Sequence, residues 1–573
     1  MARQPFETKI QDMVYGLEVG IGSRISQIAL GLLGILCLML LFTATQFRGL
    51  KDAEAMDAAQ IGRNIMEGRG FSTQCIRPAS MGQVLQVLPK AGPRVLNHPD
   101  LYHAPLYPVI LSLGFRIFPS AFNTGESGGV FAPEQWVVVP INHLFLLLSS
   151  LLTFLIARRL LGNLRALLCT LSLFLSYQFW ADSIAGMGLP IVTFFFLASF
   201  YFALLAVYHL EADKVRLWRL FALLSAIAAT LAVLTRYAAL AAIPGILLYL
   251  ALSFGKRRWY VTVLFCAVVL IGLAPWMVRN QKLSGTPFGL APRTALYDSR
   301  LYAEDHIDRT LKPVLTFGSV LQSLRAKGME NLDKYYGHQF FSFGEGLLFP
   351  FFIAAFFFRF LRRDIQLFRW CIGLSMVCML LTASIFGDSV YRVMNIFWPL
   401  VIIYGFAFFF LLLDRLQFHL KMLRGAVIVL LMLFSAIPMI FALLPPRVGV
   451  PYPPYFPPFI VSVSRMLEPT EVLMTDMPWA TAWYGHRASI YLTSSLDGFF
   501  EINDYQQRIS AIYFTTLTRD KAWIRDLKTG PYKTWQPILE GRVPKDFPLL
   551  HGFPMNNLDQ LFLADRARWA EKS

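Results

Sequence analysis

The chain has 573 residues, of which 56% are hydrophobic and only 15% are charged. Soluble domains carry roughly 25% charged residues, so this composition, with repeated apolar runs of about 20 residues, excludes a soluble protein and indicates an integral membrane protein. The formal net charge of +16 is the surplus expected of basic cytoplasmic loops, and it does not indicate nucleic-acid binding.

The first apolar segment, about 26–47, is long enough to cross the membrane, and a long polar loop follows it. The next apolar piece, 104–118, is too short to cross, because spanning takes about 20 residues. If it crossed, the arginines that follow the span at about 136–157 would lie outside, against the preference of Lys and Arg for the cytoplasmic side. The sequence therefore predicts an interfacial or re-entrant helix on the outer face at 104–118.

The basic loops then alternate so that nine more spans are predicted, about eleven in all, with the N-terminus inside and the C-terminus outside. Their approximate ranges are 163–180, 184–208, 217–235, 237–254, 259–278, 345–361, 366–386, 391–413 and 425–444. The fold class that follows is an all-α polytopic membrane bundle with a small C-terminal α/β domain on the outer side.

We expect residues 1–444 to form the membrane domain, with long outer loops at 48–135 and 279–344. The proline-rich stretch 445–459 is interpreted as a stiff collar, since proline fixes φ and lacks an amide donor. Within 460–573, EVLMTD, ASIYL and AIYFTTLTRD have strand patterns, and ATAWYGHR has the pattern of a helix start. This alternation predicts the α/β domain.

Three acids open the first outer loop. Glu54 and Asp57 are three residues apart on an expected helix, so their side chains share one face, and Asp52 lies at the helix entrance. A carboxylate at this place can accept a proton from an acceptor hydroxyl or amine, and it can also hold a divalent cation. The structural alternative is that these acids cap the helix and are solvated.

Three further residues are candidates for contact with an acceptor, a sugar or a metal. The two prolines of YHAPLYP fix a tight outer turn that places His103 and Tyr107 near the bilayer surface. Asp182 follows an expected span so closely that its charge is costly unless it is paired or hydrated. A rigid corner with a solvated histidine is the alternative for His103.

Three arginines lie at outer ends of expected spans, where the preference for the cytoplasmic side does not account for them. They are Arg236 in LTRYA, Arg279 in PWMVRN and Arg392 in SVYRVMN. Guanidinium groups bind phosphate through paired donors, so these residues are candidate ligands of a lipid phosphate. Snorkelling toward lipid headgroups is the alternative.

Several of these segments together resemble the bacterial members of the dolichyl-phosphate-mannose-protein mannosyltransferase group: PWMVRN followed by SGTPF, YHAPLYP, LTRYA, and the acid-rich loop running into IGRNIMEGRGF. That group includes lipid A aminoarabinose transferases and has the C-type glycosyltransferase fold. The likeness covers about residues 26–400, and TDMPWATAWYGHR resembles the outer domain that some members append. The family's Asp-Glu pair falls by register on Glu54 and Ala55, so Glu54, Asp57 and Asp52 all stay candidate bases.

The resemblance implies an enzyme that moves a sugar from a polyprenyl-phosphate donor to a lipid, glycan or protein acceptor, on the outer face of the bacterial inner membrane. Arg279, Arg392 and Arg236 would bind the donor phosphate, and a first-loop carboxylate would deprotonate the acceptor, with inversion at the sugar. The six cysteines show no CxxC pair and no zinc spacing, so neither a disulfide framework nor a structural zinc is expected. A divalent cation is the one candidate cofactor, and the sequence does not assign its ligands.

Two other classes of function stay open at this point. A transporter or flippase of a lipid-linked sugar would show inverted repeats with broken helices near the membrane midplane. The sequence shows no repeat of fixed period, and its polar groups gather on one side of the membrane. A non-catalytic envelope scaffold would tolerate the loss of the first-loop acids.

Overall fold

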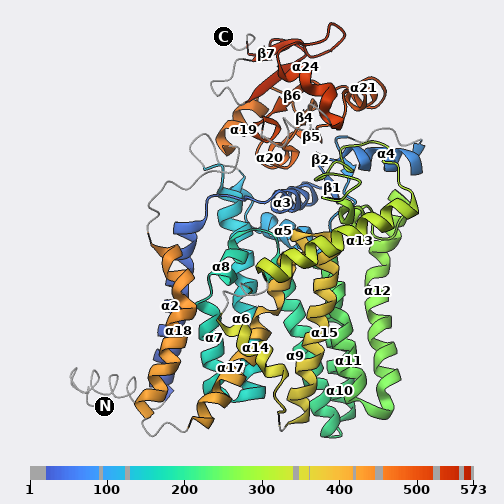
Figure 1. Cartoon of the computed structure of the whole chain (residues 1–573). Helices are drawn as coiled ribbons and strands as arrows, with labels where there is room; N and C mark the ends of the chain where they lie inside the picture. Colours follow the sequence, from blue (N-terminus) through green and yellow to red (C-terminus); the bar gives the residue numbers. More distant parts are fainter. Residues whose placement is uncertain are drawn as a thin grey trace, which may run out of the picture.

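The computed structural model describes residues 21–89, 95–122, 129–339, 343, 347–360, 362–416, 421–444, 456–519, 530–553 and 560–569. A bundle of long helices forms one end of the molecule, and a mixed α/β domain covers the other end (Figure 1). The expected collar at 445–459 lies mostly outside the described residues, as do the first twenty residues.

Eight helices among the described residues are long and apolar enough to cross a membrane. They are α2 (Ile21–Gln46), α6 (Val139–Leu161), α9 (Leu189–Glu211), α10 (Val215–Thr235), α12 (Arg258–Ser284), α15 (Arg363–Phe386), α17 (Trp398–Arg415) and α18 (Lys421–Leu443). These spans make the chain a multi-pass membrane protein.

Three of the expected spans are broken or short. Residues 163–180 form α7 (Asn163–Phe174) and the start of α8 (Tyr177–Ile184), which are bent by 57°. The segment 237–254 forms the 3-10 helix η4 (Tyr237–Ala242) and α11 (Ile243–Ser253), and 345–361 contains only α14 (Leu348–Phe356). By length and composition the described residues hold eight spans, or nine if the bent pair is one span, so the expected number of eleven is not confirmed.

A layer of shorter helices lies between the spans and the α/β domain, at the end of the bundle that we call the outer end (Figure 1). Helix α5 has twelve residues and is packed beside α3, which matches the expectation of a helix at 104–118 that does not cross. The helices of this layer are α3 (Ala53–Met66), α4 (Pro78–Val87), α5 (Leu106–Ile117) and α13 (Phe317–Lys334).

Short helical turns flank the layer helices or lie between spans. They are η2 (Pro119–Ala121), η3 (Glu134–Val138), η5 (Gly255–Arg257), η6 (Ala291–Leu296), η7 (Tyr335–Gln339), α16 (Asp388–Tyr391) and η9 (Arg392–Phe397).

The α/β domain contains a six-stranded sheet in the order β2-β5-β4-β6-β8-β7. Its strands are β4 (Val472–Thr475), β5 (Ala488–Tyr491), β6 (Ala511–Phe514), β7 (His551–Phe553), β8 (Leu561–Ala564) and β2 (Cys75–Ile76). Strand β2 comes from the first outer loop and pairs in parallel with β5, with Cys75 opposite Ser489. The first loop therefore supplies one edge strand of the C-terminal sheet.

Strands β4, β5 and β6 are parallel, while β8 pairs antiparallel with both β6 and β7. A separate pair of strands in the first loop, β1 (Ser72–Thr73) and β3 (His98–Pro99), is antiparallel. The helices of the domain are α19 (Pro457–Ser464), α20 (Pro478–Trp483), α21 (Leu496–Tyr505), α22 (Thr516–Arg519), η10 (Pro531–Trp535) and α24 (Gln536–Leu539).

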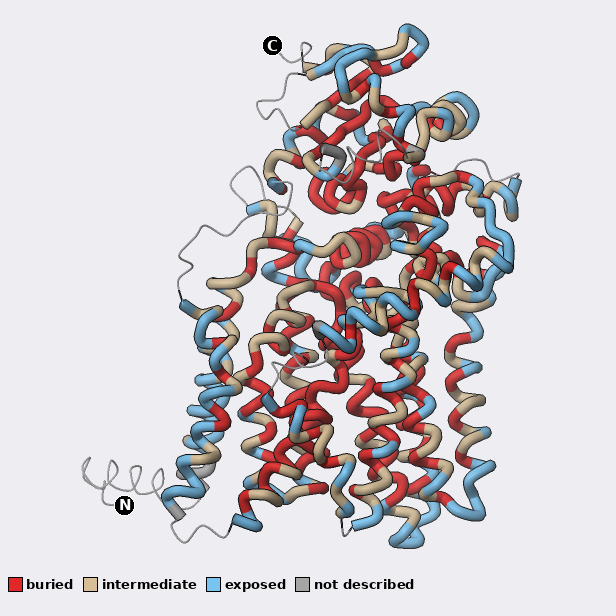
Figure 2. The backbone as a smooth tube through the Cα atoms, in the orientation of Figure 1, coloured by how far each residue is buried: buried red, intermediate tan, exposed pale blue. Residues whose placement is uncertain are grey.

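The interior of the bundle is largely apolar, and some of its polar groups form hydrogen bonds between helices. Ser199 of α9 and Ser225 of α10 each donate to the other's carbonyl oxygen at 2.8 Å. Buried residues concentrate along the axis of the bundle and in the outer layer, whereas α2 and α18 at its side are largely exposed (Figure 2). Exposed leucines on these two helices are expected where a span faces lipid.

Candidate active site

The candidate site begins where the chain leaves α2 and enters α3. Asp52 precedes α3 with an extended backbone (φ −89°, ψ 133°), and Glu54 stands in the first helical turn. Acids at this end of a helix are stabilised by the helix dipole. Asp52 makes no side-chain cap bond, and its carboxylate turns to an arginine from a distant part of the chain.

Two ion pairs join the first-loop acids to arginines at the outer ends of other helices. Arg392 Nη1 lies 2.6 Å from Asp52 Oδ1, and Arg236 Nη2 lies 2.5 Å from Glu54 Oε1. Met187 is shared, because Arg236 donates to its carbonyl oxygen (3.2 Å) and Arg392 to its sulfur (3.4 Å). The side chains of Glu54 and Arg392 are 37% and 51% exposed, so a ligand can reach this arrangement.

The break between α7 and α8 is held in place by two tryptophans. The indole of Trp180 donates to the carbonyl oxygen of Phe174 (2.8 Å), one of the carbonyls that a helix end leaves without a helical partner. The indole of Trp398 donates to the hydroxyl of Ser176 (3.1 Å) within the break. The bend directs α8 and its Asp182 to the outer end of the bundle.

Asp182 completes the group of acids around Arg392. Its two carboxylate oxygens accept hydrogen bonds from the side-chain amides of Gln178 (2.8 Å) and Asn395 (2.9 Å). Asn395 lies on the same short helix η9 as Arg392, and the charge of Arg392 interacts with Asp182 as well as with the two acids at the start of α3. Three carboxylates and two guanidinium groups therefore share one neighbourhood, which we call the open site (Asp52, Glu54, Asp182, Arg236 and Arg392).

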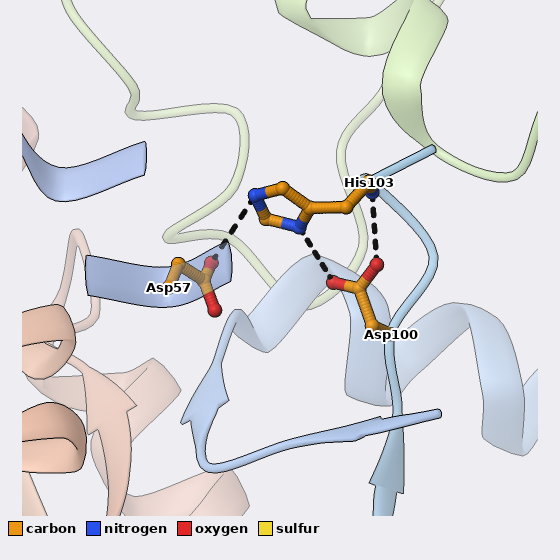
Figure 3. Close-up of side chains that lie close together, drawn as sticks. All are labelled: Asp57, Asp100 and His103. Atoms are coloured by element: carbon orange, nitrogen blue, oxygen red, sulfur yellow. Dashed lines mark hydrogen bonds and ion pairs between the residues drawn. The ribbon is translucent and has the colours of Figure 1, made fainter. Parts of the chain in front are cut away.

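Asp57, one turn further along α3, belongs to a different group. Its side chain is 1% exposed, Arg77 Nη2 lies 3.2 Å from its Oδ2, and Thr73 donates to its Oδ1 at 3.1 Å. His103 lies between two carboxylates, with Nδ1 3.1 Å from Asp100 Oδ1 and Nε2 3.9 Å from Asp57 Oδ2 (Figure 3). Burial separates Asp57 from the exposed acids although all three stand near the start of one helix.

Arg77 ties the second outer loop and the C-terminal domain to this group. Its Nε lies 3.4 Å from Asp308 Oδ2, and its guanidinium carbon lies 4.2 Å from the ring centroid of Tyr102 and 5.3 Å from that of Tyr491. Asp308 also accepts hydrogen bonds from the hydroxyls of Tyr102 (2.7 Å) and Tyr297. We call this group the buried cluster (Asp57, Arg77, Asp100, His103 and Asp308).

Within the buried cluster, the carboxylates of Asp57 and Asp100 face the positive charges of Arg77 and His103. Burial opposes the charged form of His103, but Asp100 and then Asp57 raise its pKa to about 9. Burial likewise opposes ionisation of Asp100, yet His103 holds the pKa of that carboxyl well below its usual range. At neutral pH the imidazole is therefore protonated and bridges two carboxylates.

Asp57, Asp100 and His103 are also the group whose donor atoms, all within 4.8 Å of one another, have a geometry that could hold a metal ion. Two carboxylates and an imidazole are a suitable donor set, but a ligating imidazole must be neutral. Here the proton on His103 and the guanidinium of Arg77 already neutralise the carboxylates. A cation could therefore bind at these three residues only with loss of the proton from His103.

Two of the expected site residues donate hydrogen bonds to backbone carbonyl oxygens. Arg279 donates to the carbonyl oxygens of Asp100 (2.7 Å) and Phe71 (3.0 Å), so its guanidinium holds the first loop instead of joining Arg236 and Arg392 through a shared contact. The hydroxyl of Tyr107 donates to the carbonyl oxygen of Gly186 (2.6 Å) and supports the turn that carries Met187.

Sequence reasoning did not single out Asp100, Arg77 and Asp308. Asp100 precedes His103 by three residues within NHPDLYH, a spacing at which an acid can bind the imidazole, so a local signal was present. Arg77 and Asp308 lie in different outer loops, and no local pattern marks them as partners. Their roles depend on burial that only the fold creates.

Comparison with solved structures identifies the architecture. ArnT from Cupriavidus metallidurans bound to undecaprenyl phosphate matches with a TM-score of 0.54 and 12% identity, over 95% of this chain and 98% of that chain. The Archaeoglobus fulgidus oligosaccharyltransferase tethered with an acceptor peptide containing the NVT sequon matches with a TM-score of 0.54 and 14% identity, over 94% of this chain and 74% of that chain. No protein-family model matches the chain, and no curated protein matches it in sequence. At these identities the likeness establishes the fold, and the chain has the expected C-type glycosyltransferase fold.

Proposed function

We propose that this chain is a membrane glycosyltransferase that moves a sugar from a polyprenyl-phosphate donor to an acceptor on the outer face of the bacterial cytoplasmic membrane. The observation that carries the proposal is the open site, where three acids meet two arginines at the outer ends of the helices. A structure of the same fold is bound to undecaprenyl phosphate, and another is tethered with an acceptor peptide. Both support a lipid-linked donor and a separate acceptor.

The orientation follows from the distribution of basic residues. Turn η5, with Lys256 and Arg257, joins α11 and α12 at the end of the bundle farthest from the α/β domain (Figure 1). Lys and Arg in short loops favour the cytoplasmic side, which supports an outer location for the open site and the C-terminal domain.

The donor phosphate would compete with the carboxylates for the guanidinium groups. In the structure Arg236 holds Glu54 and Arg392 holds Asp52. A phosphate that binds these arginines through charge-assisted hydrogen bonds would release a carboxylate from its ion pair. The same two positive groups would stabilise the charge that develops on the departing phosphate as the sugar–oxygen bond breaks. Donor binding would thus free the base that the reaction needs.

Glu54 is the best candidate for that base. Its carboxylate is partly exposed and lies at the open site, so an acceptor hydroxyl or amine can reach it. Asp57 is 1% exposed and its oxygens are held by Thr73 and Arg77, which fits a supporting role. A phosphate leaving group needs little protonation, so one carboxylate on the opposite face of the sugar suffices, in contrast to the two of glycosidases, and the product is inverted.

Glu54→Gln tests the assignment directly. In purified protein supplied with undecaprenyl-phosphate sugars and membrane lipids or peptides as acceptors, we expect release of undecaprenyl phosphate to slow by at least about 100-fold, because the amide cannot take the acceptor's proton. Glu67→Gln is the matched control, since Glu67 caps the other end of α3 and pairs only with Arg69 among its recorded ion pairs. Wild-type turnover in Glu54→Gln would refute Glu54 as the base.

A further inference from the structure

Trp483, the last residue of α20 in the C-terminal domain, contacts two residues of the membrane domain. Its indole Nε1 donates to Glu134 Oε1 (2.7 Å), and its carbonyl oxygen accepts from Arg63 Nη1 (2.8 Å). Glu134 is fully buried at the start of the π-helical turn η3, and Arg63 is buried in the last part of α3. One residue of the C-terminal domain therefore reaches both the start of span α6 and the helix that carries the acids.

The second oxygen of Glu134 holds the chain just before the open site. The backbone N–H of Leu50 donates to Glu134 Oε2 at 2.9 Å, and Leu50 is two residues before Asp52. Gly49 precedes it in a left-handed conformation (φ 85°), and a Cβ there would lie 2.5 Å from the ring of Phe131. The turn into α3 is thus fixed by one hydrogen bond and by close packing.

Arg63 fixes the other end of α3 to the same short helix. Its Nη2 donates to the carbonyl oxygen of Ala482 (2.6 Å) and to Gln74 Oε1 (3.0 Å), and its guanidinium carbon lies 5.2 Å from the ring centroid of Trp483. The C-terminal helix α20 consequently holds α3 before its first turn, through Glu134, and in its last turn, through Arg63. Glu54 lies between these two attachments.

The chemistry of Glu134 indicates why it is a carboxylate. A buried charge is costly, and an apolar residue of similar volume would fill the same space. A carboxylate offers two acceptor oxygens here: one accepts from the N–H of Leu50 and the other from the indole of Trp483, and the side chain of Tyr484 also hydrogen-bonds the group. The carboxyl group of Glu134 therefore links Trp483 of the C-terminal domain to the backbone of Leu50 at the entrance of α3, so a displacement of one would displace the other.

We propose that Trp483 and Glu134 are positioning residues for the first-loop acids, so that the C-terminal domain completes the active site. The kinetic side of this inference rests on the proposed function, while its structural side does not. Positioning acts on the reacting geometry, and displacements of about 1 Å can cost about 100-fold in rate. Arg236 and Arg392, the candidate phosphate ligands, form their hydrogen bonds with Met187, Glu54 and Asp52.

Trp483→Phe keeps an aromatic ring and removes only the N–H donor to Glu134. We expect kcat to fall at least about ten-fold while KM for the undecaprenyl-phosphate sugar stays within about two-fold, because the phosphate ligands are untouched. Trp535→Phe is the matched control. Trp535 is buried in the same domain and donates its indole N–H to the carbonyl oxygen of Thr493 (2.9 Å), away from α3. It should leave both constants unchanged.

A second variant tests the link through Glu134. The Glu134→Gln variant replaces one acceptor oxygen with an NH2 group. This group faces one of the two N–H donors and cannot accept its hydrogen bond, so we expect a larger loss of kcat than in Trp483→Phe. In the double variant the indole donor is gone, and the amide oxygen can accept from Leu50 again. The double variant should therefore recover to the level of Trp483→Phe. Losses that multiply in the double variant would overturn the link.

Hydrogen exchange of the backbone amides at 49–57 tests the structural side of the inference separately from its kinetic side. Faster exchange in Trp483→Phe, but not in Trp535→Phe, supports positioning, and it does so even if the wild-type protein transfers no sugar, an outcome that would defeat the proposed function alone. Unchanged exchange in Trp483→Phe overturns the positioning inference, whether or not kcat falls, because the segment would then not depend on the indole.

Discussion

Glu54 and Asp57 lie three residues apart on one helix, and the fold gives them opposite environments. Glu54 is at the open site with Arg236 as its partner, whereas Asp57 is enclosed with Arg77 and His103. A carboxylate that must exchange partners during a reaction has to be accessible, and one that holds a loop has to be dry and fully bonded. Burial therefore distinguishes two acids that their spacing made equivalent.

The buried cluster should make stability depend on pH through His103. Its pKa is about 9 in the folded protein and 6.5 ordinarily, so its contribution is fully present below about pH 6.5 and is lost as pH rises through 9. The shift corresponds to roughly 3 kcal/mol. We expect the unfolding temperature in detergent to decline from pH 6.5 to 9, and His103→Gln to remove most of that decline.

His98→Gln serves as the control for this titration. Burial lowers the pKa of His98 to about 4, so this neutral side chain does not change charge in the folded protein between pH 6.5 and 9. Its variant should keep the wild-type decline even if it loses overall stability with its hydrogen bond to Ser80. An equal slope in wild type and His103→Gln would show that the imidazole does not bridge the two carboxylates.

At the scale of elements, the turn from α8 to α9 determines whether the open site can form. It carries Met187, which contacts both arginines of the site, between two glycines with positive φ. Gly188 (φ 70°, ψ 13°) is packed on the ring of Tyr107, where an added Cβ would lie 2.8 Å from the ring. The hydroxyl of Tyr107 donates to the carbonyl oxygen of Gly186, so the same side chain contacts both glycines of the turn.

Gly188→Ala should destabilise the protein by more than the backbone conformation alone requires. Gly285 has the same left-handed conformation (φ 74°, ψ 4°), but a Cβ there would meet Val87 at an ordinary 3.7 Å. We expect Gly285→Ala to cost about 1 kcal/mol and Gly188→Ala to cost about 1–3 kcal/mol more, from the clash with Tyr107. Thermal unfolding of both variants in detergent measures the difference, and equal midpoints would contradict the packing described.

Apolar run length and basic loops were sufficient to predict the long spans and the helix at 104–118, and local strand patterns predicted β4, β5 and β6. They did not predict the break between α7 and α8, where Trp398 from a distant part of the chain binds Ser176 and adds to the local bond of Trp180 to Phe174. They also could not predict β2, whose two residues become a strand only against β5. Local patterns carry information about single elements, while breaks and edge strands depend on distant partners.

For the candidate site, too, the sequence predicted some features, whereas others became clear only from the structure. Topology alone placed Arg236 and Arg392 on the outer side with the acids, and the structure brings these groups into ion pairs. The same argument applied to Arg279, yet its donors go to backbone carbonyls of the first loop. The side of the membrane on which a residue lies therefore determines which charged groups can be near one another. Side-chain packing then determines which of them form ion pairs.

At the scale of the whole molecule, the first loop, the second outer loop and the C-terminal domain form one continuous outer layer. Arg77 joins Asp57 of the first loop to Asp308 of the second and packs on Tyr491 of the C-terminal sheet. Apolar packing follows the same route, since Phe115 of α5 lies 6.1 Å from the ring of Trp483. The first outer loop is thus enclosed by the C-terminal domain on one side and the spans on the other.

This continuity predicts that the C-terminal domain stays bound without its covalent connection. With a protease site inserted between residues 444 and 456, we expect the cleaved fragment to remain with the membrane domain through size-exclusion chromatography in detergent. The pairing of β2 with β5 and the bonds of Arg63 to α20 would hold it. Ile76→Asp places a charge in the buried core of the sheet and should release the fragment, whereas Leu550→Asp, at an exposed position, should not. If the wild-type fragment separated after cleavage, the outer layer would be held together by the chain connection, and Trp483 could not position α3 across the interface.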